Sequence, residues 1–187
     1  MAPLTLRPLT AKNWREFEIL FGERGACGGC WCQWWRLSRA DFDRLKGDGN
    51  KKRMRSLVHA GEVPGLLGYR EGAPVAWCSL APRESFPVLD RSRVLKRVDD
   101  KPVWSLVCFF VAKPFRRQGL MPRLIAEAAA YARQQGVEIL EAYPVEPKKG
   151  NQADLFLYTG VASAFRKAGF AEVARRSPTR PIMRLEL

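Results

Sequence analysis

One stretch that could do chemistry is a basic, glycine-containing turn that follows an apolar run. The turn reads FRRQGLMPRL from Phe115 to Leu124, and the apolar run covers residues 102–112. A helix that begins at Gly119 offers backbone N–H groups without intrahelical partners and the positive end of its dipole, so it suits a phosphate. Glycine lets the backbone approach a ligand, and the arginines at 116 and 117 add positive charge. The alternative interpretation is a solvated corner between a strand and a helix.

A second stretch, CGGCWCQWWR from Cys27 to Arg36, brings together three cysteines and three tryptophans. A closed zinc site needs four ligands, and no histidine or fourth cysteine lies nearby in the sequence, so we predict no metal site. A disulfide is disfavoured in a reducing compartment. Two alternatives remain, a hydrophobic core segment and an aromatic pocket wall, and three indoles beside an arginine favour the pocket.

Other elements must hold these two stretches in place. The apolar pattern predicts a strand at 4–9, helices at 10–21, 38–45 and 51–59, and a hairpin of strands at 65–70 and 73–82. The break between the second and third helices is KGDGN, and residues 83–101 read as a loop. A buried central strand at 102–112 precedes a helix at 119–135, a strand at 137–145, a helix capped by Thr159, and two edge strands at 171–176 and 181–187.

Composition narrows the class of protein. The 187 residues predict one domain, 1–187, long enough to bury a core without disulfides. The five cysteines, an odd number, together with the lack of a signal sequence or a membrane-spanning run, predict a cytoplasmic protein that does not enter a membrane. Lys and Arg total 32 against 19 Asp and Glu, a net charge of +13, which favours a polyanionic partner: nucleic acid, an acidic surface or a phosphorylated cofactor.

The basic turn resembles the acyl-CoA loop of the GNAT family of N-acetyltransferases. That loop follows the pattern Arg/Gln-x-x-Gly-x-Gly/Ala, and Arg116, Gly119 and Met121 stand at its positions, with Met121 in place of the usual small residue. The order of elements along the whole chain and the segment FRKAGF, residues 165–170, also resemble the family. The resemblance implies an α+β fold with a mixed, largely antiparallel sheet of six or seven strands and helices on both faces.

The resemblance further implies that acetyl-CoA is the acyl donor. Its pantetheine arm would lie where the central strand and the strand at 138–145 splay apart, hydrogen-bonded to backbone groups near Phe109 and Val111. Its pyrophosphate would lie on the amides of residues 116–121. The residues implied to bind the cofactor are Phe109, Phe110, Val111, Arg116, Arg117, Gln118, Gly119, Leu120 and Met121.

Direct acyl transfer needs a base for the amine and an acid for the departing thiolate. The family often supplies a Glu from the central strand and a Tyr from the last helix, but VWSLVCFFV has no carboxylate and Phe165 replaces the Tyr. Tyr158 is the nearest hydroxyl, as an acid or as a packing residue. Glu141, in mid-strand, and Glu84 are the candidate bases, with an ion pair to one of the many arginines as the alternative for each.

The family forms its acceptor side from the region between the first two helical segments, and the cysteine-tryptophan stretch lies in that region of this chain. The resemblance therefore implies that Trp31, Trp34, Trp35 and Arg36 bind the acceptor, a primary amine of a small molecule or a peptide. The guanidinium of Arg36 suits an acidic group on that amine. Two other classes remain: a catalytically silent acyl-CoA-binding module, and a nucleic-acid-binding domain, which only the charge supports. The sequence leaves open the acceptor, the acyl chain and the oligomeric state, with a homodimer as one option.

Overall fold

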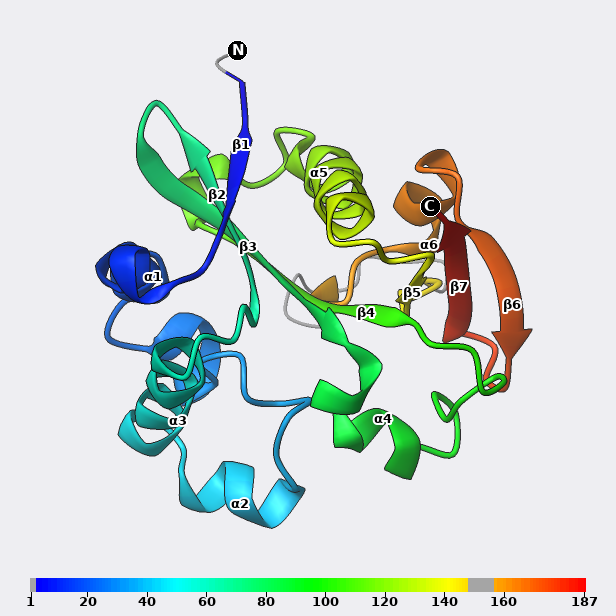
Figure 1. Cartoon of the computed structure of the whole chain (residues 1–187), viewed down its shortest axis with the longest axis horizontal. Helices are drawn as coiled ribbons and strands as arrows, with labels where there is room; N and C mark the ends of the chain where they lie inside the picture. Colours follow the sequence, from blue (N-terminus) through cyan, green and yellow to red (C-terminus); the bar gives the residue numbers. More distant parts are fainter. Residues whose placement is uncertain (1–2, 148–156) are drawn as a thin grey trace.

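A single seven-stranded sheet organises the chain (Figure 1). The computed structural model describes residues 3–147 and 157–187. The strands are β1 (Thr5–Pro8), β2 (Gly65–Arg70), β3 (Ala73–Pro82), β4 (Trp104–Val111), β5 (Ile139–Ala142), β6 (Ala171–Arg175) and β7 (Pro181–Glu186). Their order in the sheet is β1-β2-β3-β4-β5-β7-β6, and every neighbouring pair is antiparallel except β4 and β5. The predicted mixed, largely antiparallel α+β fold is confirmed.

Six α-helices connect or cover the described strands: α1 (Trp14–Phe21), α2 (Arg39–Arg44), α3 (Asp48–His59), α4 (Pro87–Arg91), α5 (Leu120–Gln134) and α6 (Ala162–Lys167). Helix α5 lies against one face of the sheet, whereas α1 and α3 lie on the other (Figure 1). None of the helices in the described ranges is long and apolar enough to cross a membrane.

Four details of the predicted elements are wrong. The segment KGDGN, residues 46–50, was predicted to precede the third helix, but α3 begins at Asp48 and includes its last three residues. Residues 83–101 include the short helix α4. Strand β7 lies between β5 and β6, so of the two predicted C-terminal edge strands only β6 lies at an edge of the sheet. Thr159 is buried and does not cap α6, whose N-cap is Val161.

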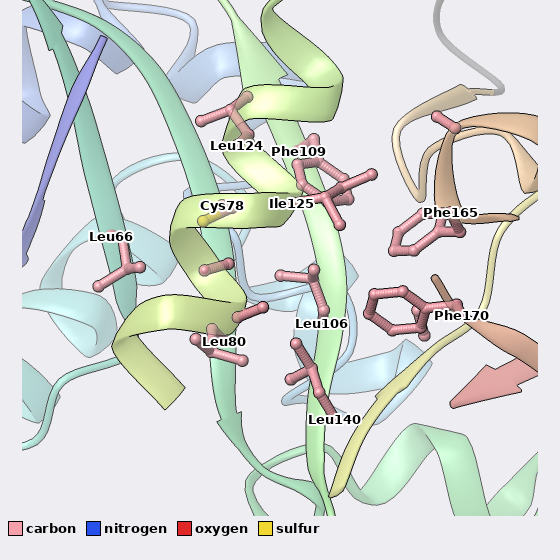
Figure 2. Close-up of a cluster of buried hydrophobic side chains, with 14 of the residues drawn as sticks. Leu66, Cys78, Leu80, Leu106, Phe109, Leu124, Ile125, Leu140, Phe165 and Phe170 are labelled. Atoms are coloured by element: carbon pink, nitrogen blue, oxygen red, sulfur yellow. The ribbon is translucent and has the colours of Figure 1, made fainter. Parts of the chain in front are cut away.

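The core on the α5 face explains the amphipathic pattern of that helix. Leu124 and Ile125 pack with sheet residues such as Leu66 and Leu106 (Figure 2). Phe165 of α6 fills the same core, in contact with Phe170 at a ring-centroid distance of 5.0 Å. Both helices are therefore anchored on this side of the sheet by buried apolar area, the main stabilising term of folding.

The opposite face holds a second core rich in aromatic side chains. Phe17 and Phe21 of α1 pack edge to face against Trp77 of β3, with centroid distances of 4.9 and 5.9 Å. Trp31 stacks on Phe21 at 5.7 Å. The segment between α1 and α2 is therefore part of the fold and is held against the sheet by its indole.

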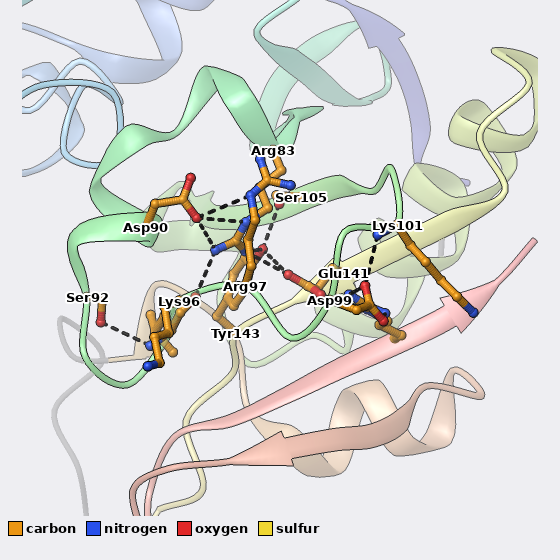
Figure 3. Close-up of polar contacts among 12 residues, drawn as sticks. Arg83, Asp90, Ser92, Lys96, Arg97, Asp99, Lys101, Ser105, Glu141 and Tyr143 are labelled. Atoms are coloured by element: carbon orange, nitrogen blue, oxygen red, sulfur yellow. Dashed lines mark hydrogen bonds and ion pairs between the residues drawn. The ribbon is translucent and has the colours of Figure 1, made fainter.

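A buried polar network joins the turn after β3 to β5 and β7, at the end of the sheet where β4 begins (Figure 3). Arg83 donates to Glu141 at 2.8 Å, and Arg184 donates to the other carboxylate oxygen at 2.7 Å. The hydroxyl of Tyr143 also donates to Glu141, at 2.6 Å. A carboxylate buried in mid-strand is costly unless it is paired, and here both oxygens have partners.

Candidate active site

The site lies where β4 and β5 part. The two strands pair in parallel from Trp104 to Leu106 on β4, and no pairing with β5 continues beyond Leu106. A cavity of about 470 Å³ lies near the far end of β4. Its lining residues are Ala26, Cys27, Phe109, Phe110, Val111, Phe115, Arg116, Arg117, Gly119, Leu120, Met121, Leu157, Tyr158, Gly160 and Val161.

The turn before α5 forms one wall of this cavity. Gly119, the N-cap of α5, has a left-handed backbone with φ of 69°, and a Cβ there would meet no atom within 4 Å. Arg117 also has positive φ, 60°. The first turn of α5 contains no acidic residue. Because the amides of a helix N-terminus lack intrahelical acceptors, this wall can accommodate an anion.

Two side chains fix the shape of the turn. Arg116 donates from Nε to the carbonyl of Val111 at 2.9 Å, so it links the turn to the end of β4. Gln118 donates to the carbonyl of Pro114 at 2.9 Å and accepts from Arg70 at 2.6 Å. Gln118 is the one predicted cofactor residue that does not line the cavity; the other eight do.

The segment from Leu157 to Val161 forms the opposite wall. The Phe109 amide donates to the Tyr158 carbonyl at 2.6 Å. The segment therefore lies beside β4 just beyond the residues of β4 that pair with β5. Val161 forms a parallel bridge with Val145, which continues the line of β5. One backbone group predicted to hold pantetheine, the Phe109 amide, is therefore engaged within the protein.

Tyr158 is the predicted catalytic residue that lines the cavity. Its ring lies 6.3 Å from that of Trp35, and it packs against the cluster that contains Trp35. Burial raises the pKa of Tyr158 to about 12, so its hydroxyl keeps its proton across the physiological range. Tyr158 therefore retains a hydrogen-bond donor at neutral pH, on a residue that lines the cavity.

The two candidate bases lie elsewhere. Glu141 is 1% exposed and lies in the network with Arg83 and Arg184. Glu84 follows β3, whose last residue pairs with Trp104 at the start of β4, the end opposite the cavity. It pairs with Arg97 at 2.7 Å, and this contact lowers its pKa. Neither carboxylate lines the described cavity, and both take the alternative role of an ion-pair partner.

None of the four predicted acceptor residues lines the described cavity. Trp31 belongs to the aromatic core, Trp34 packs edge to face on Phe42 at 5.1 Å, and Trp35 lies behind Tyr158. Arg36 lies over the ring of Phe86 and donates to the carbonyl of Pro64 at 3.3 Å. Desolvation lowers the pKa of Arg36, against the opposing influence of Cys32 and of the Glu62 carboxylate.

Two residues of the cysteine-rich loop line the cavity although the sequence did not predict it. Ala26 and Cys27 reach the cavity because the loop turns sharply, with φ of 66° at Ala26, 55° at Gly28 and 71° at Gly29. The Gly-Gly pair predicts a tight turn but not its direction. Among the described residues, no group of three or more His, Cys, Asp or Glu could hold a metal ion.

Comparison with known proteins decides the family. The model of the acetyltransferase (GNAT) family matches residues 31–171, about three quarters of the chain. The chain belongs to the GNAT acetyltransferase family. The match spans β4, the basic turn and α5, which together form most of the cavity. No curated protein matches the sequence significantly.

Solved structures share this GNAT fold at low sequence identity. A GNAT acetyltransferase from Listeria monocytogenes has a TM-score of 0.61 at 12% identity, covering 100% of this chain and 98% of its own. PaiA N-acetyltransferase from Thermoplasma acidophilum, in complex with coenzyme A, has a TM-score of 0.54 at 12% identity, covering 99% of each. A polyamine N-acetyltransferase from Drosophila melanogaster that forms N-acetylagmatine has a TM-score of 0.57 at 12% identity, covering 99% and 100%.

The wall formed by residues 157–161 gives a stability prediction. Gly160 has φ of 81°, and an added Cβ would lie 2.7 Å from the ring of Phe165. We expect Gly160→Ala to lower the free energy of unfolding by about 2–4 kcal/mol, because strain and overpacking add. Gly136→Ala is the matched control: its φ is 74° with no atom within 4 Å, so only the strain of about 1 kcal/mol applies. Equal losses in urea unfolding would show that Phe165 is not packed against this wall.

Proposed function

We propose that the protein is an N-acetyltransferase that transfers an acetyl group from acetyl-CoA directly to a primary amine of a small molecule or a peptide. The observation that carries this proposal is the cavity itself. It joins the free end of β4 to the N-terminus of α5, at the point where the sheet opens. A neighbour of the same fold was crystallised with coenzyme A, and another is a polyamine N-acetyltransferase, which supports both the donor and the class of acceptor.

The residues present suit acetyl-CoA as the donor. The anion-accepting wall at Arg117 and Gly119 is one part of the cavity, and apolar residues such as Phe109, Val111 and Met121 line the rest. Acetyl-CoA has a phosphorylated end, which suits the anion-accepting wall, and an extended arm, which suits the apolar lining. We assign the pyrophosphate to the amides around residues 116–121 and the arm to the end of β4.

Tyr158 is the residue we assign to the departing sulfur. A thiol has an ordinary pKa of about 8.5, so complete proton transfer from a phenol with a pKa of about 12 is uphill. The hydroxyl is better suited to donate a hydrogen bond to the negative charge that develops on sulfur. The proton that sulfur finally takes can come from the attacking amine, which must lose one after it bonds to the acetyl carbon.

The acceptor would enter on the side of the loop that contains Ala26 and Cys27. Trp35 packs against Tyr158, which lines the cavity, whereas Arg36 lies over the ring of Phe86. We therefore assign Trp35 to shaping the acceptor end. Arg36 could recognise an acidic group on the acceptor only if its contact with the Pro64 carbonyl exchanged for one with the ligand.

A second candidate function is an acyl-CoA-binding module without catalysis. It is favoured by the lining, which contains no carboxylate among the described residues, and by Phe165, which is fully buried at the position of the family tyrosine. Amine-dependent release of thiol from acetyl-CoA separates the two functions, because a binding module would bind the donor without consuming it.

The donor site is tested at the turn before α5. We expect Gly119→Glu to lower the affinity for coenzyme A by about 100-fold or more, because it places a carboxylate at the N-terminus that should hold a phosphate. Isothermal titration calorimetry measures this directly. The matched control is Gly136→Glu, at the other end of α5, where the backbone φ is also positive and the added side chain also meets open space. If both variants bound coenzyme A like the unmodified protein, the turn would not be the phosphate site.

The role of Tyr158 is tested by removing only its hydroxyl. Tyr158→Phe should lower the turnover number by about 100-fold or more, with little change in the KM for acetyl-CoA. The ring contact with Trp35 and the backbone bond to Phe109 are retained, so the loss would report the O–H group. Steady-state kinetics at pH 7.5 gives both constants. Unchanged turnover would assign Tyr158 to packing alone.

A further inference from the structure

One arginine beside the cavity wall has no carboxylate partner. Arg180 is the last residue of the turn between β6 and β7, and it is half-buried. Its amide donates to the Ser177 carbonyl at 3.2 Å, and its Nη1 donates to the Thr159 hydroxyl at 3.3 Å. Among the residues that the structure describes, no Asp or Glu forms an ion pair with Arg180. Its guanidinium is therefore held in place but not neutralised.

Two other arginines of the same hairpin are paired with carboxylates. Arg175 bonds to Glu146 at 3.0 Å, and Arg184 bonds to Asp99 at 2.7 Å. Glu146 also lies beside the turn, since its amide donates to the Thr179 carbonyl at 2.9 Å, but its carboxylate bonds to arginines of β6 and α6. Within the described part of the chain, the ion pairs of the hairpin therefore leave the guanidinium at its turn without a counter-ion.

The bond to Thr159 places this guanidinium next to a wall of the cavity. Thr159 is fully buried and directly follows Tyr158, which lines the cavity. The positive charge of Arg180 acts on the Tyr158 phenol, where it opposes the rise in pKa that burial causes. Arg180 therefore lies at the end of the site where Tyr158 packs against Trp35, which is the end that we assign to the acceptor.

Other donors near this end also have no acceptor. Trp35 is 7% exposed, and its indole N–H is buried without a hydrogen-bond partner among the described residues. The same is true of Nε of Arg36. Desolvation lowers the pKa of Arg180, so its charge is partly removed from water. Because buried donors and a partly desolvated cation are stabilised by a negatively charged partner, these groups favour an anionic ligand.

We propose that Arg180 binds a carboxylate of the acceptor, so that the acceptor is an amine that also carries a carboxylate, as in an amino acid or an acidic peptide. This inference rests on the proposed function. Within the described residues only Nη1 of Arg180 is bonded, so Nε and Nη2 can donate side by side to the two carboxylate oxygens. Arg180 does not line the described cavity, so the carboxylate would lie past Tyr158 while the amine enters the cavity.

The same arrangement disfavours a polyamine. A second ammonium group on the acceptor would lie near the Arg180 guanidinium, and like charges in a partly desolvated site repel. Among the described residues that line the cavity, no Asp or Glu could compensate that second charge. The acceptor of this chain would therefore differ in charge from the polyamine that the Drosophila melanogaster enzyme of the same fold acetylates.

Three series of amines test the acceptor class in the unmodified protein. ω-Amino carboxylates, n-alkylamines and terminal diamines of equal length differ at the far end, which is anionic, neutral or cationic. With acetyl-CoA as donor, we expect kcat/KM to be at least about tenfold higher for the best amino carboxylate than for its neutral and cationic counterparts. Preference for a diamine, or equal use of the three, would overturn this inference and leave the proposed function intact. No transfer to any of them, nor to amino acids and peptides, would overturn the proposed function and this inference with it.

Substitutions test whether Arg180 is the residue responsible. Arg180→Gln should lower kcat/KM for the preferred amino carboxylate by about 10- to 100-fold, with the alkylamine and the affinity for coenzyme A unchanged. Arg180→Glu should shift the preference toward the diamine. The matched control is Arg133→Gln, which removes one exposed positive charge from the last turn of α5, at the end of the helix opposite the cavity.

The control variant should keep the preference of the unmodified protein. Unchanged use of the amino carboxylate by Arg180→Gln would overturn the assignment of Arg180. An equal loss in Arg133→Gln would also overturn it, because net charge alone would then decide the preference. Calorimetry with coenzyme A shows that each variant is folded, and if Arg180→Gln is not, the milder Arg180→Lys, which keeps the charge but not the planar group, should lose part of the preference.

Discussion

The separation of two parallel strands is the constraint on which the rest of the site depends. Strands β4 and β5 share only three register pairs before they diverge, and β4 then runs on to Val111 without β5 beside it. Unpaired backbone groups within a sheet must find other partners. The Phe109 amide donates a hydrogen bond to the Tyr158 carbonyl, and the Val111 carbonyl accepts one from Arg116. These two bonds bring the opposite walls of the cavity to the same strand.

The buried ion pairs at the other end of the sheet have the complementary role. Glu141 accepts hydrogen bonds from Arg83, Arg184 and Tyr143, so the turn after β3 is joined to β5 and β7 where β4 and β5 are paired. Burial of Tyr143 raises its pKa well above the ordinary value, which keeps its hydroxyl available as a donor in this network. The sheet is thus closed by charge-assisted bonds at one end and opened by strand divergence at the other.

The sequence predicts the scaffold well because periodicity and helix signals are local. The buried strand before the basic turn and the amphipathic helix after it lie where the pattern places them, and eight of the nine predicted cofactor residues line one cavity. Catalytic carboxylates could not be predicted in the same way. Glu141 and Glu84 have the right residue type, but arginines distant in sequence determine their surroundings. The positions of Ala26 and Cys27 at the cavity depend on left-handed backbone angles in the loop, which the amino-acid composition does not reveal.

The proposed function requires that this cavity binds acetyl-CoA and supports transfer of its acetyl group to an amine. The most direct measurement is steady-state release of coenzyme A thiol from acetyl-CoA, with a panel of polyamines, amino acids and peptides as acceptors. We expect thiol release that depends on at least one amine and is matched by the acetylated product. Binding of coenzyme A by calorimetry, with no amine-dependent release across the panel, would contradict it and favour a binding module.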